Sequence, residues 1–214
     1  MITSYNKMYL SQVKKQFGIM LDYVVYGLKA DLNTFWNKFI NSDLCKRLEK
    51  GDISVISGKS GIEITYEILG LKQKKIRYLG AIGYKSEEYW AGWAITYYQW
   101  ARNISFEKIN TFININEIVN MYHPYHEMDI LQFCDRLDEL YLNKYPYPNL
   151  KILREKIGIS QSELAFYTGI SVRTIQEYEQ RKKDINKANF EYILLFSKVL
   201  WCKPEDLYEP IVNL

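Results

Sequence analysis

Three clusters of side chains in this 214-residue sequence have types and spacings that a chemical site could use. In the first cluster, Gly58, Lys59 and Ser60 resemble the end of a phosphate-binding loop, where a lysine holds phosphate and a hydroxyl holds Mg²⁺. That loop requires a glycine five residues before Gly58, but Ile53 occupies this position and Gly51 is two residues too distant. We therefore interpret the segment as a glycine-rich turn, with a phosphate loop as the alternative.

The second cluster contains possible metal ligands, namely His123, His126 and Glu127. Pro124 lies between the two histidines and disfavours the helical histidine pair of a metalloprotease. The three cysteines are scattered and none forms a pair at zinc-finger spacing. We interpret the cluster as a capped turn with two surface histidines, and we predict no metal and no cofactor. The carboxylates are spread along solvated faces, so no general acid–base pair stands out and no enzyme is predicted.

The third cluster is an aromatic stripe formed by Trp90, Trp93, Tyr97 and Trp100. Its spacing places all four rings on one face of a helix that Ser86 caps and that ends near Asn103. Such a stripe could form a ligand cage or a stacking platform. Because an aromatic stripe at helical spacing is more often part of a core, we predict that these rings are packed inside the domain.

The elements that must position these clusters are mostly helical. Apolar residues at spacings of three and four predict a helix over residues 7–28, and Asp31 is a plausible cap for the next one. Residues 52–68 are ambiguous, because their apolar residues alternate as in a strand while residues 62–69 could also form a helix. Further helices are predicted over residues 44–50, 86–103, 105–111, 116–122 and 128–143. The predicted fold class is therefore all-α for most of the chain, with a small β element left open in the N-terminal domain.

A domain boundary is predicted at residues 145–149, where Pro146 and Pro148 remove backbone donors and disfavour helix before them. This linker separates an N-terminal helical domain, residues 1–144, from a C-terminal domain, residues 150–214. The net charge is +3, of which the chain from Asn149 onward contributes 10 − 9 = +1 and the rest 18 − 16 = +2. Neither part is a basic block, so bulk charge does not identify a partner.

Three further observations concern the location of the protein. No apolar run approaches the roughly 18 residues that a membrane span needs. The first nine residues are polar and lack the layout of a signal peptide. The unpatterned cysteines fit reduced thiols. We therefore expect a cytoplasmic protein with no membrane association.

The C-terminal domain reads as five helices with tight connections. The first, residues 150–157, directs Leu150, Leu153 and Ile157 inward. The second starts at a capping box formed by Ser160 and Glu163. Gly169 can take a left-handed conformation in the turn that follows. Ser171 caps the third helix, residues 172–180, in which Ile175 and Tyr178 face the core. A fourth helix over residues 187–200 carries Phe190, Ile193, Leu194 and Val199, and a last short helix starts at Pro204.

This layout resembles the phage-repressor (Cro-like, lambda-repressor-like) helix-turn-helix family over residues 150–208. The matching motifs are Leu-x-x-Leu-Arg from Leu150, Ser-Gln-x-Glu-Leu-Ala from Ser160 and Thr-Gly-Ile-Ser from Thr168. Arg-Thr-Ile-Gln-x-Tyr-Glu from Arg173 and Pro-Glu-Asp-Leu from Pro204 complete the set. In this family the third helix enters the major groove and the second braces against the DNA backbone.

The resemblance implies which residues contact double-stranded DNA. The base readers would be Val172, Arg173, Gln176 and Glu177. Val172 would meet a thymine methyl group, Arg173 a guanine and Gln176 an adenine. Contacts to phosphate would come from Gln161, Thr174, Gln180, Lys182, Lys183 and Lys187. After Glu179, where many members have a glycine, this chain has Gln180-Arg181-Lys182-Lys183, which makes the loop more basic and should add backbone affinity.

The resemblance also implies a DNA-binding regulator of transcription, specifically a dimeric repressor on a two-fold symmetric site. The N-terminal domain would then serve dimerisation, protein binding or the sensing of a small-molecule effector. The alternative is an antitoxin whose N-terminal domain neutralises a toxin while the C-terminal domain represses the shared operon. Residues 83–86 and 93–100 resemble uncharacterised regions of helix-turn-helix proteins from Gram-positive bacteria, which implies no mechanism. The operator, the effector, the dimer interface and the direction of regulation stay open.

Overall fold

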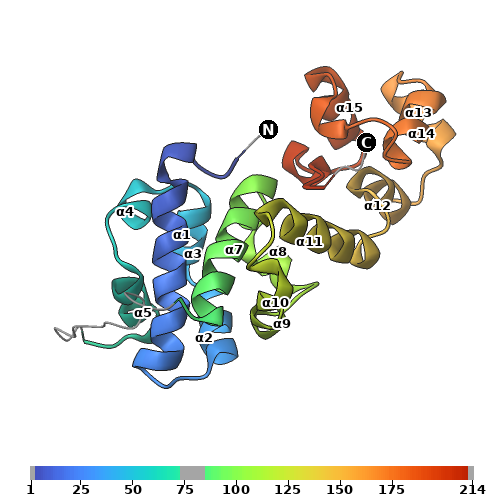
Figure 1. Ribbon diagram of the computed structural model, residues 1–214. Coiled ribbons are helices and arrows are strands. Elements are labelled where there is room, and N and C mark those ends of the chain that lie inside the picture. Colours follow the sequence, from blue (N-terminus) through green and yellow to red (C-terminus); the bar gives the residue numbers. More distant parts are fainter. Residues whose placement is uncertain (1–2, 73–84, 212–214) are drawn as a thin grey trace. The chain divides into compact units, whose positions relative to one another are not determined.

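The computed structural model describes residues 3–72 and 85–211, and every regular element within those ranges is helical (Figure 1). The chain divides into two compact units, residues 1–140 and 141–214, which we call the N-terminal unit and the C-terminal unit. The division lies inside helix α11 (Ile130–Lys144), before the prolines at which the sequence places the linker. Of the residues that resemble Gram-positive proteins, 93–100 lie in a helix, whereas Gly83 and Tyr84 lie outside the described residues.

Two long helices and several short ones form the N-terminal unit. The first long helix, α1 (Lys7–Asp22), continues into a π-helical turn, η1 (Tyr23–Gly27). The second is α7 (Glu87–Arg102), which Ser86 caps as predicted. The shorter elements before α7 are α2 (Leu32–Ile40), α3 (Asp43–Glu49), α4 (Ile53–Ile56) and α5 (Gly61–Leu69). Those after it are α8 (Phe106–Asn110), α9 (Ile115–Asn120), α10 (Tyr122–Tyr125) and the start of α11.

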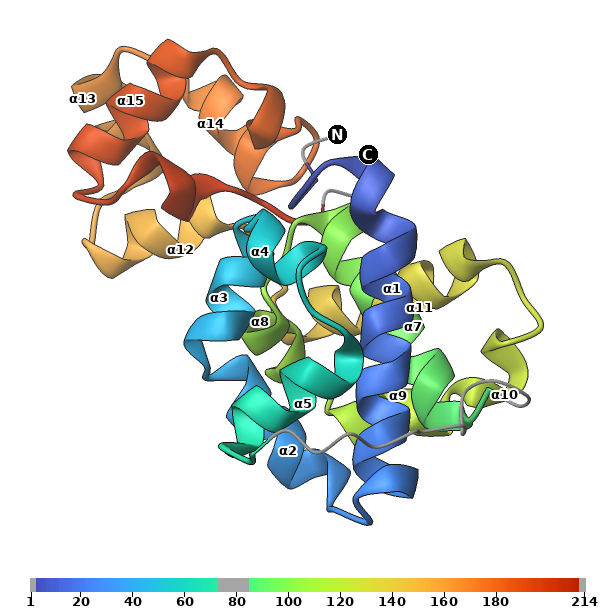
Figure 2. The same cartoon turned by 90° about the vertical axis from the view of Figure 1, so that its left-hand side faces the viewer.

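Helix α1 is the centre of this unit, with α5 and α7 packed against it (Figure 2). Two glycines make this close packing possible. A Cβ atom at Gly92 of α7 would lie 2.4 Å from the carbonyl oxygen of Phe17, and one at Gly61 of α5 would lie 2.2 Å from that of Gln16. Since a real Cβ atom cannot approach an oxygen so closely, any larger residue at either position would push these helices away from α1.

Aromatic rings fill the space between α1, α2 and α8. The ring of Phe17 stacks on that of Phe106 at 5.2 Å and meets that of Phe39 edge-on at 5.3 Å, and Trp36 closes the cluster at 5.5 Å from Phe106. All four side chains are buried. Offset and edge-on rings are the favoured arrangements for aromatic pairs, so the cluster adds packing energy to its buried area.

The predicted aromatic stripe of α7 is only partly a core element. Trp90 and Trp100 are buried, and the indole N–H of Trp100 donates to the carbonyl of Tyr5 at 2.8 Å. Trp93 and Tyr97 are half-buried. The core interpretation therefore holds for two of the four rings and fails for the other two, which reach the surface.

Residues 52–68 form α4 and most of α5 with a turn between them, and the described residues contain no strand. Asp52 caps α4, while Ser60 and Glu63 form a capping box at the start of α5. Gly70 ends α5 in a left-handed conformation, with φ at 63°. These local caps explain why the helical alternative prevails over the alternation of apolar residues. Lys59 pairs with Glu67 at 2.6 Å while Ser60 caps a helix, so Gly58-Lys59-Ser60 is the turn that the sequence predicts.

The described residues of the C-terminal unit form four α-helices and two 3₁₀ turns beyond α11. They are α12 (Asn149–Lys156), α13 (Gln161–Thr168), α14 (Val172–Glu179), η2 (Ile185–Lys187), α15 (Phe190–Val199) and η3 (Pro204–Leu207). The predicted fifth helix is thus a single 3₁₀ turn at Pro204. The core of the C-terminal unit includes Leu150, Leu164, Ile170, Ile175, Tyr178, Ile185, Phe196, Leu200 and Leu207.

Two residues predicted on the inner faces of these helices are exposed. Ile157 is the C-cap of α12, and Phe190 is the first residue of α15 rather than a residue of its second turn. The fourth helix starts later than predicted because Asn189 caps it, and Phe196 and Leu200 lie in the core while Phe190 does not. Helical periodicity gives the buried face, but it does not fix where a helix begins.

Candidate nucleic-acid interface

The connection between α13 and α14 has the caps that the sequence predicts. Ser160 Oγ accepts from the Glu163 N–H while the Glu163 carboxylate accepts from the Ser160 N–H, which completes the capping box. Gly169 ends α13 with φ at 72°, in the left-handed region. Ser171 then caps α14 by accepting from the Thr174 N–H at 3.1 Å. Within three residues one helix ends and the next begins, as a helix-turn-helix motif requires.

Helix α14 separates its residues onto two faces. Ile175 and Tyr178 are buried in the core, as predicted. Arg173 and Gln176 are exposed on the other face, and the side chain of Arg173 is 88% exposed. Residues three apart are neighbours on a helix surface, so these two side chains present a guanidinium and an amide side by side. The remaining predicted contacts of this helix, Val172, Thr174 and Glu177, are half-buried.

An ion pair joins α12 to the end of α14 inside the unit. Arg154 Nε donates to Glu179 Oε1 at 2.6 Å, and Arg154 Nη2 donates to Glu179 Oε2 at 2.9 Å. Arg154 Nη1 also donates to the carbonyl of Ile159 at 2.8 Å. The side chains are only 9% and 2% exposed, and the hydrogen bonds to Glu179 raise the pKa of Arg154 above its usual value. This ion pair with two hydrogen bonds fixes α12 against α14.

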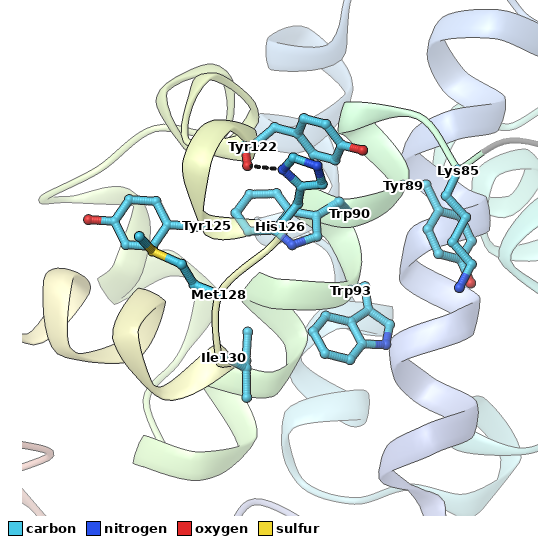
Figure 3. A pocket seen from close by; sticks show the side chains of 9 residues that line it. All are labelled: Lys85, Tyr89, Trp90, Trp93, Tyr122, Tyr125, His126, Met128 and Ile130. Atoms are coloured by element: carbon cyan, nitrogen blue, oxygen red, sulfur yellow. Dashed lines mark hydrogen bonds between the residues drawn. The ribbon is translucent and has the colours of Figure 1, made fainter.

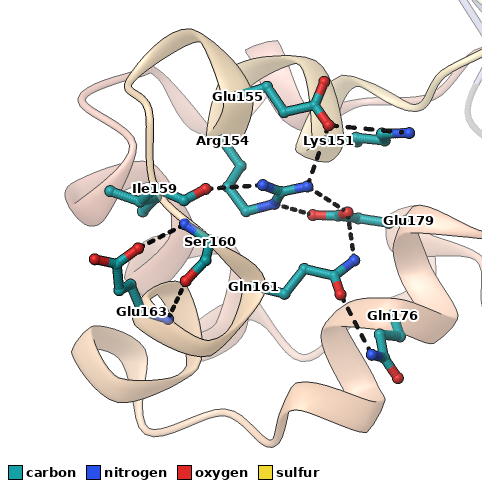
Figure 4. Close-up of polar contacts among 9 residues, drawn as sticks. All are labelled: Lys151, Arg154, Glu155, Ile159, Ser160, Gln161, Glu163, Gln176 and Glu179. Atoms are coloured by element: carbon teal, nitrogen blue, oxygen red, sulfur yellow. Dashed lines mark hydrogen bonds and ion pairs between the residues drawn. The ribbon is translucent and has the colours of Figure 1, made fainter.

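A chain of hydrogen bonds leads from this ion pair to the surface (Figure 4). Gln161 Nε2 donates to Glu179 Oε2 at 2.8 Å, and Gln176 Nε2 donates to Gln161 Oε1 at 3.3 Å. The buried carboxylate therefore sets the orientation of the Gln161 amide, which in turn positions Gln176. One N–H of each amide group is used in this chain, and the second stays available to an external acceptor.

Two cations hold the carboxylate of Glu177. Lys183 Nζ lies 2.6 Å from Oε2 and Arg173 Nε lies 3.3 Å from Oε1. The hydrogen bond from Lys183, followed by that from Arg173, lowers the pKa of Glu177. Glu177 is thus ionised at neutral pH and already paired with two of the residues predicted to contact DNA.

The other residues predicted to contact DNA differ in the interactions that they form within the protein. Thr174 Oγ1 lies 2.9 Å from Ser171 Oγ, so this hydroxyl belongs to the helix cap. Lys187 Nζ lies 3.3 Å from Asp184 and its side chain is 76% exposed. Gln180 is the exposed C-cap of α14. Lys182 is exposed and forms no ion pair within the described part of the chain.

Arg181 has a structural role that the sequence did not predict. It takes a left-handed conformation, with φ at 53°, just after α14. Its guanidinium donates to the carbonyls of Pro146, at 2.8 Å, and Tyr145, at 3.2 Å, and approaches Glu209 at 3.5 Å. The side chain is only 14% exposed. The expected gain in surface charge from Arg181 is therefore wrong, because its charge faces the linker carbonyls and Glu209. Only Lys182 and Lys183 make this loop basic.

Comparison with known proteins agrees with this geometry. Residues 150–207 match the family model described as helix-turn-helix. The segment is a helix-turn-helix domain. It covers all the elements from α12 to η3, so the family resemblance predicted from the sequence is confirmed for the C-terminal unit. The search of curated proteins and the search of solved structures each returned no match.

The helix-turn-helix domain makes this protein a DNA-binding regulator of transcription. The buried Arg154–Glu179 pair, the Gln161–Gln176 chain and the exposed face of α14 all lie within the matched residues.

Within residues 3–72 and 85–211, no helix is both long and apolar enough to cross a membrane. The same ranges hold no group of three side chains that could bind a metal ion.

Proposed function

We propose that the protein is a sequence-specific repressor that binds DNA through α14. The observation that supports this proposal best is the pairing of Arg173 and Gln176 on the exposed face of that helix, with Gln176 oriented by the chain from Glu179. Arginine and glutamine each form two hydrogen bonds to the major-groove edge of one base, guanine and adenine respectively. A fixed amide loses less conformational entropy on binding than a mobile one, which favours specific recognition.

The residues of the interface then divide into two classes. Val172, Arg173 and Gln176 read bases, and Glu177 joins them by accepting from cytosine once its cations turn to the DNA. The phosphate contacts are Gln161, Thr174, Gln180, Lys182, Lys183 and Lys187. At the start of α13, the N–H groups of Gln161 and Ser162 have no acceptor within their own helix, so they also suit a phosphate.

A homodimer on a two-fold symmetric operator fits this proposal, with two copies of α14 about 34 Å apart. Exposed aromatic side chains of the C-terminal unit support such an association. Phe166 is 83% exposed and Trp201 is 91% exposed, and Trp201 lines a surface groove together with Ile157, Tyr167 and Val199. Exposed apolar patches of this kind commonly mark protein–protein contacts.

Fluorescence anisotropy on the DNA upstream of the gene tests the proposal. The wild-type protein should prefer this DNA over a scrambled sequence, and Arg173→Ala should lose the preference. Arg136→Ala is the matched control, because Arg136 is a half-exposed arginine of α11 outside the helix-turn-helix domain. If the wild type shows no preference, or if both variants behave alike, α14 does not read the operator. A pull-down for a toxin-like protein partner would then test the antitoxin alternative.

A further inference from the structure

A pocket in the N-terminal unit lies between α7 and the segment from α10 to the start of α11 (Figure 3). Its volume is about 360 Å³, which falls within the range of small-molecule sites. The aromatic side chains of Tyr89, Trp90, Trp93, Tyr122 and Tyr125, together with the ring of His126, form most of its wall. Two rings of the aromatic stripe of α7, the buried Trp90 and the half-buried Trp93, thus line this pocket.

The aromatic wall is held in place before any ligand binds. Trp90 meets Tyr122 edge-on at 5.8 Å and Phe133 at 5.4 Å. The ring of His126 stacks on that of Tyr122 at 3.9 Å, with only 13° between their planes, and His126 Nδ1 is hydrogen-bonded to the carbonyl of Tyr122 at 2.9 Å. Rings fixed by their neighbours form a rigid apolar slot, which suits a flat ligand.

The charges at the pocket favour an anion over a cation. Lys85 contributes an ammonium group to the lining, and none of the described residues that line the pocket carries a carboxylate. A second ammonium group, that of Lys14, lies 4.1 Å from the ring centroid of Trp93. Three acids adjoin lining residues in the sequence, namely Glu88, Glu127 and Asp129, and none of them belongs to the described lining. Glu127 approaches His126 Nε2 at 3.4 Å with a side chain that is 75% exposed, and the exposed Asp129 accepts from the Leu131 N–H at 2.8 Å. Aromatic cages that bind ammonium ligands gain from the negative ring faces, and here Lys14, which is not part of the described lining, already lies over one face of Trp93.

We propose that this pocket binds a small planar aromatic molecule that carries a negative charge, such as an aromatic carboxylate. The rings of Trp90, Trp93 and Tyr122 contact its apolar plane, and Lys85 meets its anionic group. Ile130, which also lines the pocket, is the first residue of α11, and α11 leads into the C-terminal unit. The role of this molecule as an effector rests on the proposed function as a repressor, whereas its binding does not.

Isothermal titration calorimetry without DNA tests the binding directly. Three probes share one ring system and differ in charge, namely indole-3-acetate, indole-3-acetamide and tryptamine. The full-length protein should bind the anion at least about tenfold more tightly than the cation, with the neutral amide between them. Lys85→Gln should remove most of this difference, while Lys38→Gln, an exposed lysine of α2, should leave it unchanged.

Two further variants locate the site. Trp93→Ala should weaken the binding of indole-3-acetate about tenfold or more, and Trp201→Ala, which removes an exposed tryptophan of the other unit, should have no effect. Ile130→Trp fills the pocket and should abolish binding in a protein whose circular dichroism is unchanged.

Equal or tighter binding of tryptamine, no binding of any probe, or full binding to Ile130→Trp would each overturn the proposal. A wild type that binds indole-3-acetate but shows no operator preference would support the pocket while contradicting the repressor.

Discussion

Each of the two faces of α14 carries a glutamate paired with cations, but one of these contacts is buried and the other is exposed. On the buried face, Glu179 forms two hydrogen bonds with Arg154 and both side chains are almost inaccessible. On the exposed face, Glu177 is shared by Arg173 and Lys183, whose side chains are 88% and 52% exposed. The buried pair cannot open without leaving an uncompensated charge, whereas the exposed group can exchange one partner for another at small cost. One helix thus combines a permanent attachment with a surface that can rearrange on DNA.

The largest expected effect comes from breaking the buried pair. Glu179→Ala leaves the Arg154 guanidinium buried without its counter-charge and should lower the free energy of unfolding of the C-terminal unit by about 3–5 kcal/mol. Scanning calorimetry would measure this loss. The double variant Arg154→Met/Glu179→Leu should recover most of it. If the double variant is as unstable as Glu179→Ala, the loss comes from packing and not from the unpaired charge.

The second effect concerns base reading on the exposed face. Arg173→Ala should weaken binding to the specific DNA site by about 1–3 kcal/mol and relax the preference at one base pair. The calorimetric melting temperature should hardly change, because the side chain of Arg173 is 88% exposed. Anisotropy titrations on operators varied at single positions would measure both quantities. A uniform loss on all sequences would instead make Arg173 a phosphate contact.

A smaller effect is expected at Lys182, which is exposed and lies in the loop after α14. Lys182→Ala removes about one phosphate contact, so the slope of log K against log salt concentration should fall by roughly 0.9. The loss should be equal on operator and scrambled DNA. Titrations at four salt concentrations would measure the slope, with Lys198→Ala of α15 as the control. An unchanged slope would place Lys182 away from the DNA backbone.

The smallest effect is expected when the exposed carboxylate is neutralised. Glu177→Gln frees Arg173 and Lys183 for phosphate, so the affinity for scrambled DNA should rise slightly and the salt slope should steepen, while the preference for cytosine at one operator position should weaken. The unfolding temperature should stay nearly constant because exposed ion pairs contribute little. An unchanged preference at every operator position would contradict the proposal that Glu177 reads cytosine.

The part of the fold that could be predicted from the sequence is the part set by local chemistry. Ser160, Glu163, Gly169 and Ser171 act within three residues of their own position, and each caps or turns the chain as predicted. The contact between Arg154 and Glu179 spans 25 residues. No local rule indicates such a pair, although a buried arginine and glutamate must find partners once the helices pack.

The residues predicted to contact DNA also show that local sequence patterns do not indicate contacts between distant side chains. The spacing of α14 predicted that Arg173 and Gln176 face outward, but it could not predict that Glu177 is held by two cations or that Gln161 is oriented by Glu179. The sequence predicted Arg181 as part of a basic surface because it stands next to two lysines, but its side chain turns inward. The pocket of the N-terminal unit depends on α10 meeting α7, which a single aromatic stripe cannot indicate.

The inward-facing Arg181 also determines where this chain can be cut. A fragment that starts at Asn149 contains the whole family match but loses the carbonyls of Tyr145 and Pro146, to which Arg181 donates. Its guanidinium would then keep only Glu209 and would have to face water or repack the left-handed residue that carries it. We therefore expect that a stable DNA-binding fragment should begin at about Tyr141 rather than at Asn149.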